Sequence, residues 1–163
     1  MPSFDLVSEI DKGEIKNAVD QAQREISTRY DFKGSDCSVE LKPGEEVEIE
    51  AANEYQVKAS VDILRSKMIK RGIGVKSLTL GDLKPTGNQR FKITGSFVNG
   101  IDKELGKKIN KFIKASGIKV TSAYLDEKVR ITGKKIDDLQ EIFKQLRGSE
   151  DIEVDLQMQN MKS

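Results

Sequence analysis

Residues 36–51 read DCSVELKPGEEVEIEA, and in this stretch apolar and polar residues alternate in two successive runs. The apolar positions are Cys37, Val39, Leu41, Val47, Ile49 and Ala51. A period of two is typical of a strand with one buried face. Between the runs, Pro43 and Gly44 occupy the two central positions of a type II turn. The stretch therefore predicts a hairpin of strands 36–42 and 46–51 with an acidic open face.

Helical patterns lie on both sides of this hairpin. Residues 11–30 repeat apolar side chains every three or four positions up to Tyr30, and Asp11 is placed to cap the first turn. Asn53 can cap a second helix, which ends at Arg71 and Gly72. Short strands are expected at 3–9 and 75–80. The first 80 residues thus predict the order βαββαβ.

The same order repeats after the linker-like segment 81–87, GDLKPTG. The expected elements are a strand at 90–97, a helix from 101 to near 117, a hairpin of 118–125 and 128–133, a helix at 137–147 and a strand at 152–158. The fold class is therefore α+β, with two tandem ferredoxin-like domains of the RNA-recognition-motif-like βαββαβ type. Each has a four-stranded antiparallel sheet with two helices on one face.

The charges on the open sheet faces predict an exchange of the first strands. Conventional pairing sets Asp5 and Glu9 beside the glutamates of strand 46–51, and Arg90 and Lys92 beside Lys128 and Arg130. Like charges that face each other across strands are unfavourable. Exchanging the first strands turns both repulsions into attractions. The expected domains are therefore 10–80 with strand 88–97, and 101–163 with strand 3–9, joined by the linker 81–87.

Composition argues against catalysis, metals and membranes. The 163 residues include no histidine, one cysteine and no P-loop motif, and their net charge is +1. Cys37 falls on the inward face of its strand, where a thiol is inert. No apolar run approaches the roughly 18 residues that span a membrane, and no signal peptide opens the chain. We expect a non-enzymatic cytoplasmic protein with no cofactor and no metal.

Basic residues are concentrated in the segment 88–147, which holds 14 Lys and Arg against 7 Asp and Glu. Such a segment suggests an anionic partner. The candidate contacts to a nucleic-acid backbone are Arg90, Lys92, Lys107, Lys111, Lys128 and Arg130. Helical lysines at this spacing are also explained as a solvated face. Strands 46–51 and 128–133 hold no aromatic residue, and Phe4 and Phe91 are expected to face the helices, so base stacking on the open sheets is not expected.

A second candidate site is the stretch TRYDFKGSD, residues 28–36, where aromatic and charged residues alternate. In this topology the exit of the first helix meets the start of the second, where free N–H groups favour anions. The candidate nucleotide-binding residues are Arg29, Tyr30, Phe32, Lys33, Gly34, Asn53, Tyr55, Arg65, Lys67 and Arg71. Alternatively, Tyr30 continues the apolar helix face, Phe32 closes the core and Gly34 permits a turn. Glu54, beside the expected phosphate, argues for that alternative.

Five motifs resemble the bacterial YajQ family from one end of the chain to the other. They are MPSFDLVSEID at 1–11, RYDFKGS at 29–35, DILRSKMIKRGI at 62–73, VRITGKKIDDLQ at 129–140 and LRG at 146–148. The resemblance implies two RNA-recognition-like domains with exchanged N-terminal strands. It also implies binding of a nucleotide, with RNA such as tRNA or cyclic di-GMP as ligands. The candidate stretches that match the family are Ser3–Asp5, Arg29–Gly34 and Arg65–Arg71.

The expected function is therefore nucleotide binding, with RNA or a cyclic dinucleotide as the ligand. The alternative is an adaptor that docks a regulatory protein, with the nucleotide as modulator.

Overall fold

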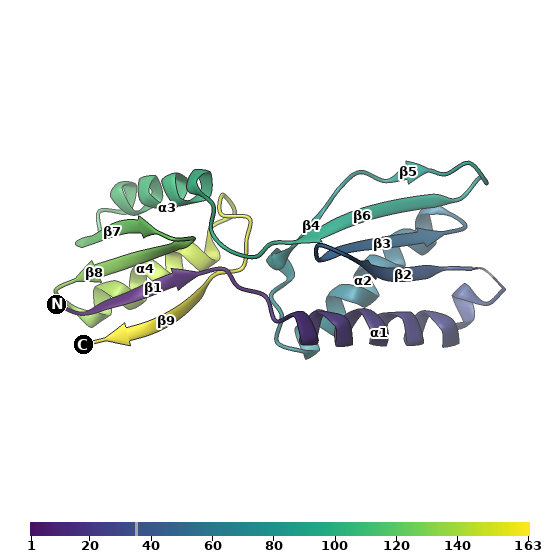
Figure 1. The fold of residues 1–163 in the computed structure, drawn as a ribbon, viewed down its shortest axis with the longest axis horizontal. Helices are drawn as coiled ribbons and strands as arrows, with labels where there is room; N and C mark the ends of the chain where they lie inside the picture. The colour runs from purple at the N-terminus through teal and green to yellow at the C-terminus, as the bar shows by residue number, and fades with distance from the viewer. Residues whose placement is uncertain (35) are drawn as a thin grey trace. The chain divides into compact units, whose positions relative to one another are not determined.

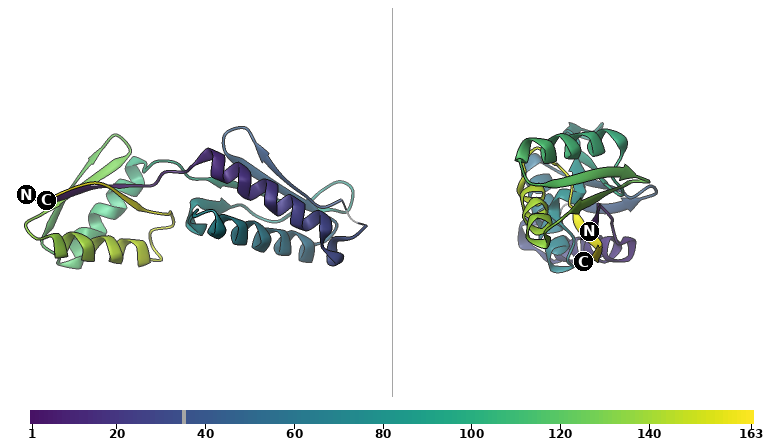
Figure 2. Two further views of the ribbon diagram at one scale, coloured as in Figure 1. Left: turned by 90° about the horizontal axis from the view of Figure 1, so that it is seen from below. Right: turned by 90° about the vertical axis from the view of Figure 1, so that its left-hand side faces the viewer.

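The computed structural model describes residues 1–34 and 36–163. These residues form two compact units, which we call the N-terminal unit (Ile10–Phe97) and the C-terminal unit (Met1–Glu9 with Val98–Ser163). In each unit two helices pack on one face of an antiparallel sheet (Figures 1 and 2). The architecture is thus α+β, and the chain passes from one unit to the other at residues 9–10 and again at 97–98. None of the described helices is both long and apolar enough to cross a membrane.

The N-terminal unit has a sheet in the order β2-β3-β6-β4, and a short strand, β5, also pairs with β6. Its elements are α1 (Lys12–Thr28), β2 (Ser38–Lys42), β3 (Glu46–Ala51), α2 (Glu54–Lys70), β4 (Leu78–Leu80), β5 (Lys84–Pro85) and β6 (Phe91–Phe97). The opening hairpin is present as predicted, with Gly44 at φ +81° in its turn. Alternate residues of β3 are buried against the helices, among them Val47, Ile49 and Ala51.

Both helices of this unit begin at the capping residues that the sequence predicts. The carboxylate of Asp11 accepts a hydrogen bond from the backbone N–H of Glu14 at 3.1 Å. The side-chain oxygen of Asn53 accepts one from the N–H of Gln56 at 2.9 Å. Each cap satisfies an N–H group that has no partner within its helix.

The C-terminal unit has a sheet in the order β7-β8-β1-β9. Its elements are β1 (Ser3–Val7), α3 (Lys103–Ser116), β7 (Val120–Leu125), β8 (Lys128–Gly133), α4 (Ile136–Gly148) and β9 (Gln157–Lys162). Phe4 is fully buried, and its ring meets that of Phe143 edge to face with centroids 5.8 Å apart. Phe4 thus faces the helices, as the alternation along its strand predicts.

β1 and β6 each lie beside strands of opposite charge in their own sheets. β1 lies between β8 and β9, with Asp5 opposite Arg130. β6 lies between β3 and β4, with Lys92 opposite Glu50. The segments 1–9 and 88–97 therefore lie in sheets whose neighbouring strands complement their charges.

Several element ends are shifted by a few residues; the predicted strand 75–80, for example, begins with a short 3-10 helix (Val75–Ser77). Three further details differ from the sequence predictions. The helix expected to reach residue 30 ends at Thr28, and a short 3-10 helix (Tyr30–Phe32) follows. The last strand is β9 at 157–162 rather than 152–158, because Ile152 and Leu156 enter the core from non-strand backbone. The expected linker 81–87 contains β5 and belongs to the N-terminal unit.

Candidate functional site

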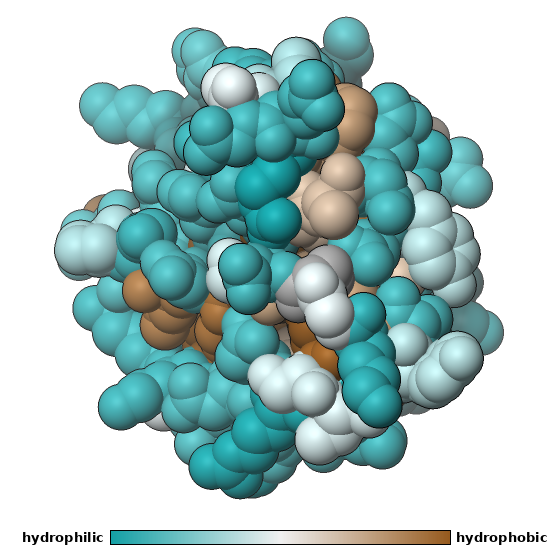
Figure 3. Space-filling model, turned by 90° about the vertical axis from the view of Figure 1, so that its right-hand side faces the viewer, coloured by the Kyte–Doolittle hydropathy of each residue, from teal (hydrophilic) through white to brown (hydrophobic). Residues whose placement is uncertain are grey.

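The end of α1 and the start of α2 meet at one end of the N-terminal unit (Figure 1), as the topology predicts. The hydroxyl of Tyr55 donates to the carboxylate of Asp31 at 3.3 Å, and the side-chain amide of Gln56 donates to the carbonyl of Asp31 at 3.3 Å. Figure 3 faces this end and shows a mainly hydrophilic surface with hydrophobic residues in small hollows. The sequence thus brings residues of two helices together at a polar surface.

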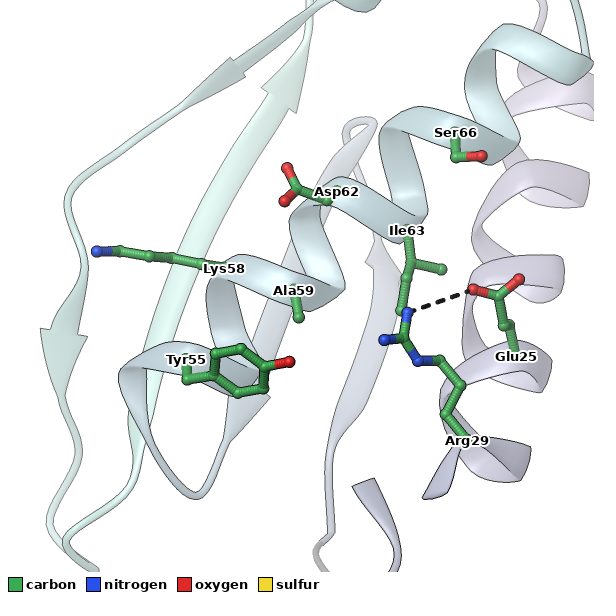
Figure 4. Close-up of a pocket in the computed structure, with 8 residues that line it drawn as sticks. All are labelled: Glu25, Arg29, Tyr55, Lys58, Ala59, Asp62, Ile63 and Ser66. Atoms are coloured by element: carbon green, nitrogen blue, oxygen red, sulfur yellow. Dashed lines mark ion pairs between the residues drawn. The ribbon is translucent and has the colours of Figure 1, made fainter. Parts of the chain in front are cut away.

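A groove of about 470 Å³ lies between α1 and α2 at this end (Figure 4). Its lining residues are Glu25, Arg29, Tyr55, Lys58, Ala59, Asp62, Ile63 and Ser66. Ala59 and Ile63 are the aliphatic part of this lining, and the ring of Tyr55 stands beside them with 62% of its surface exposed. The groove therefore combines an apolar surface, an accessible aromatic ring and charges of both signs.

Arg29 is the most strongly held cation of the groove. Its Nε and Nη2 donate to the two carboxylate oxygens of Asp31 at 2.9 Å each, and Glu25 lies 3.8 Å from Nη1. The guanidinium carbon also lies 5.5 Å from the ring centre of Phe32. The hydrogen bond between the guanidinium of Arg29 and the carboxylate of Asp31 raises the pKa of Arg29 and lowers that of Asp31. Arg29 thus remains charged and positioned by three neighbours.

The other charges of the groove differ in how they are paired. Lys67 forms an ion pair with Glu25 at 2.9 Å, and its hydrogen bond is the main cause that lowers the pKa of Glu25. Lys58 and Asp62 are exposed and form no ion pair with any residue that the structure describes. These two side chains are therefore free to meet a ligand.

The N-terminus of α2 is a weaker anion site than the sequence suggests. Asn53 already occupies the N–H of Gln56, and the side chain of Gln56 accepts from the N–H of Ala52 at 3.3 Å. Glu54 adds a negative charge to the first turn. Because the helix satisfies part of its own N-terminus, the groove beyond it is the better candidate.

The remaining residues of this predicted site lie outside the groove. Tyr30 was expected on the apolar face of α1 but is 90% exposed, because the chain leaves the helix before reaching it. Phe32 is buried in the core, whereas Lys33 and Gly34 lie exposed in the following loop. Arg65 is exposed on α2 but does not line the groove.

Arg71 lies beyond the C-terminal end of α2, where it pairs with Glu14 at 3.9 Å. Glu14 belongs to the first turn of α1. Arg29 and Tyr55 are therefore the two predicted residues that line the groove, with Lys67 attached through Glu25.

The predicted nucleic-acid residues are divided between the two units. Arg90 pairs with Glu50 at 3.4 Å and also contacts the carbonyl of Asp36, both within the N-terminal unit. Lys92 lies opposite Glu50 in the same sheet. In the C-terminal unit, Lys107 and Lys111 lie on α3, in the helical layer, and Lys128 and Arg130 on β8.

Six residues of the groove lining were not named as candidates from the sequence, although the last lies within the stretch Arg65–Arg71: Glu25, Lys58, Ala59, Asp62, Ile63 and Ser66. Tyr55, Ala59, Asp62 and Ser66 follow one another at spacings of four, three and four, which places them on one helix face. The pattern is visible in the sequence, but its small and polar residues resemble an ordinary solvated face. Only the packing of α1 beside it makes that face a groove.

Comparison with known proteins supplies a family. A family model described as "Nucleotide-binding protein YajQ-like" matches residues 2–162. A "Nucleotide-binding protein" of Aeromonas hydrophila is 48% identical over 162 residues, covering 99% of both chains. Proteins with the same name from Citrifermentans bemidjiense and Syntrophotalea carbinolica are each 43% identical over 163 residues, the full length of both chains.

Proposed function

The chain belongs to the YajQ-like family of nucleotide-binding proteins, and from this membership we propose that it binds a nucleotide in the groove between α1 and α2. The observation that carries the proposal is the groove itself, whose lining includes Arg29, Lys58 and the exposed ring of Tyr55. Its volume of about 470 Å³ falls in the range of small-ligand sites, roughly 300–1,000 Å³. The names of the relatives support this class of ligand.

Each part of a nucleotide has a counterpart in the groove. A base can stack on Tyr55, and such stacking contributes about 1–3 kcal/mol. Phosphate oxygens can accept hydrogen bonds from Lys58 and from Arg29, whose planar fork suits phosphate. Arg29 then exchanges its bond to Asp31 for one to the phosphate. The carboxylate of Asp62 can accept hydrogen bonds from ribose hydroxyls or from the N–H groups of guanine.

A mononucleotide or a cyclic dinucleotide such as cyclic di-GMP fits this arrangement better than RNA or tRNA. A nucleic-acid strand needs a continuous positive track for its phosphates. The lining of the groove instead includes the acidic residues Glu25 and Asp62 as well as the basic residues Arg29 and Lys58. Arg90, the basic residue just before β6, is already paired with Glu50. Mixed charge favours a small ligand with both phosphate and hydrogen-bond donors.

We further propose that each unit is a ferredoxin-like domain whose first strand has been exchanged with that of the other unit. The support comes from the sheet orders and from the pairing of β1 with β8 and of β6 with β3. In this proposal the two domains are connected by the chain at residues 9–10 and 97–98, and not by the segment 81–87. We also propose a cytoplasmic binding function without catalysis, since the relatives are named as binding proteins.

Isothermal titration calorimetry tests the groove with GTP, cyclic di-GMP and a mixed-sequence RNA octamer. The test variant is Arg29→Ala/Lys58→Ala, and the matched control is Lys16→Ala/Arg24→Ala, two exposed cations of α1 outside the groove. We expect a small nucleotide to bind, the test variant to weaken it about tenfold or more, and the control to bind like the wild type. Equal binding by the test variant and the wild type would overturn the groove assignment.

A further inference from the structure

Strand β7 is an open edge of the C-terminal sheet, with β8 as its one neighbour (Figure 1). Its sequence, VTSAYL, contains no charged residue and no proline, and all six residues pair with β8 in unbroken register. Charges, prolines, bulges and shortness are the features that normally prevent an edge strand from pairing with another chain. β7 has none of them.

The other edge strands that the structure describes are protected. β2 carries Glu40 and Lys42 on its open face, β4 has three residues, and β5 has only two, one of them Pro85. β9 pairs with β1 through a register shift between Ser3 and Asp5, and it includes Asn160 at φ +55° and ends at Lys162. β7 is therefore exceptional among the described edges, which points to a partner strand.

The hairpin geometry shows which groups of β7 are available. The turn between β7 and β8 consists of Asp126 and Glu127, both at positive φ, so Leu125 and Lys128 form the first hydrogen-bonded pair. Every second residue then bonds to β8, and the residues between them direct N–H and C=O away from it. These outward residues include Ser122 and Tyr124. They offer a ready backbone ladder of donors and acceptors to one more strand.

Helix α3 runs beside this edge in the opposite direction. Gly106 lets the helix approach, since a Cβ there would lie 2.6 Å from Cδ2 of Tyr124. The hydroxyl of Tyr124 donates to the carbonyl of Ile101 at 2.7 Å, and that of Ser122 donates to the side-chain oxygen of Asn110. A groove of about 240 Å³ lies between the helix and the strand. Its lining residues are Lys103, Gly106, Lys107, Asn110, Ser122, Tyr124 and Val129, with no carboxylate among them.

The charge beside the edge is positive along most of its length. Lys107, Lys111 and Lys114 follow one another along α3, and Lys119 immediately precedes β7. Negative residues gather at the opposite end, where α3 begins and the hairpin turns. They are Asp102, Glu104, Asp126 and Glu127. A strand added to β7 would thus meet lysines over its portion next to Val120–Ser122.

We propose that β7 receives an extended acidic segment of a partner protein, which adds to the sheet as a fifth strand beneath the lysines of α3. Backbone hydrogen bonds would provide affinity, and the lysines would select acidic side chains. A second copy of the chain is the competing occupant, because antiparallel pairing of β7 with β7 would set the lysines of one α3 against Asp102 and Glu104 of the other. The proposal concerns the C-terminal unit and is independent of nucleotide binding in the α1–α2 groove.

The probe is a fluorescein-labelled nonapeptide in which glutamate alternates with threonine, and a lysine–threonine peptide is its control. We expect fluorescence anisotropy to show saturable binding of the acidic peptide alone. Lys107→Glu/Lys114→Glu should weaken it by roughly tenfold or more, whereas Lys134→Glu/Lys144→Glu, on exposed lysines outside this groove, should not. Amide hydrogen exchange should slow at Ser122 and Tyr124 when the peptide binds and stay unchanged at Ala123, which already bonds to β8.

Ser122→Pro removes an outward N–H and should abolish peptide binding, and circular dichroism checks that the variant is folded. If Ser122→Pro is not folded, the hydrogen-exchange measurement on the wild type still tests whether the peptide binds to β7. Equal binding of both peptides, or no protection at Ser122 and Tyr124, would overturn the proposal. A mixed RNA that binds through the lysines but ignores Ser122→Pro would identify a nucleic-acid surface instead. Concentration-dependent dimers in sedimentation that Ser122→Pro dissociates would identify a second copy as the occupant.

Discussion

The guanidinium of Arg130 donates a 2.9 Å hydrogen bond to the carboxylate of Asp5, although the two residues are 125 positions apart in the sequence. Nη2 of Arg130 donates a longer hydrogen bond to the same carboxylate at 3.5 Å, and Asn160 donates a third at 3.0 Å. Asp5 was expected on an open sheet face, yet its side chain is only 7% exposed because these neighbours cover it. One buried carboxylate thus ties together β1, β8 and β9.

Replacing Asp5 should destabilise the C-terminal unit. We expect Asp5→Ala to lower the free energy of unfolding by about 1–3 kcal/mol, because it removes three hydrogen bonds to a buried charged group. Arg130→Ala should cost less, since Arg130 is 57% exposed and water can replace part of its contact. Urea denaturation measures both. Lys128→Ala, on the same strand as Arg130, is the control. If Lys128→Ala lowered the free energy of unfolding as much as Asp5→Ala does, the stabilising role assigned to Asp5 would be contradicted.

The same contact predicts a dependence of stability on pH. The hydrogen bond from Arg130 is the main cause that lowers the pKa of Asp5 in the folded protein, below the unfolded value of about 3.9. The carboxylate therefore contributes stability that is complete above the unfolded pKa and is lost as the pH falls through the folded pKa. The difference in unfolding free energy between wild type and Asp5→Asn should be constant from about pH 7 to 5 and shrink below about 4. A difference that grows on acidification would refute this account.

Gly106→Ala should destabilise the protein even though alanine favours helices. The helix propensity gains about 1 kcal/mol, but the new Cβ would lie 2.6 Å from the ring of Tyr124. Overpacking of this kind costs about 1–3 kcal/mol, and displacing the ring would also break its bond to Ile101. We expect a net loss near 1 kcal/mol in thermal or urea unfolding. Gly148→Ala, at the end of α4 with no atom within 4 Å, is the control and should not destabilise.

The two exposed tyrosines of the N-terminal unit should differ in their effect on nucleotide binding. Tyr55→Ala should weaken binding by about tenfold, since it removes the stacking surface of the groove. Tyr30→Ala should leave the affinity unchanged, because Tyr30 does not line the groove. Calorimetry with the nucleotide that binds the wild type compares them. A larger loss for Tyr30→Ala would move the site to the loop after α1.

Cys37 should resist thiol reagents in the folded protein. It is buried and lies 3.1 Å from the hydroxyl of Ser60, and burial is the main cause that raises the pKa of its thiol. The thiolate that reacts is therefore scarce and shielded. Ellman's reagent should react slowly at pH 8 and rapidly after urea is added. Fast stoichiometric reaction without urea would contradict this burial.

Local sequence patterns predicted most elements because the information for each lies within a few residues. Alternation fixed the buried face of β3, and Asp11 and Asn53 marked the starts of two helices. The prediction that Tyr30 lies on the buried face of the first helix was wrong. Its spacing continues the apolar pattern of the helix, but the backbone leaves the helix at Arg29. β9 was misplaced because Ile152 and Leu156 reach the core without strand pairing.

The candidate site was predicted only in part for a similar reason. Arg29 and Tyr55, which line the groove, were among the candidates because an aromatic residue and an arginine near helix ends are conspicuous. Lys58 and Asp62 were not, since a polar helix face becomes a groove only when another helix packs beside it. Likewise, the exposed β7 edge is defined by the strands that do and do not pair with it.

The sequence by itself determined the order of helices and strands, their buried faces and the charge that each strand presents, because these depend on spacing and capping along a short stretch. The tertiary structure decided which individual side chains those surfaces contact. It covered the carboxylate of Asp5 with Arg130, joined Tyr55 to Asp31, and left β7 with β8 as its one neighbour among the described strands. These outcomes depend on contacts between residues far apart in the chain, which no local period specifies.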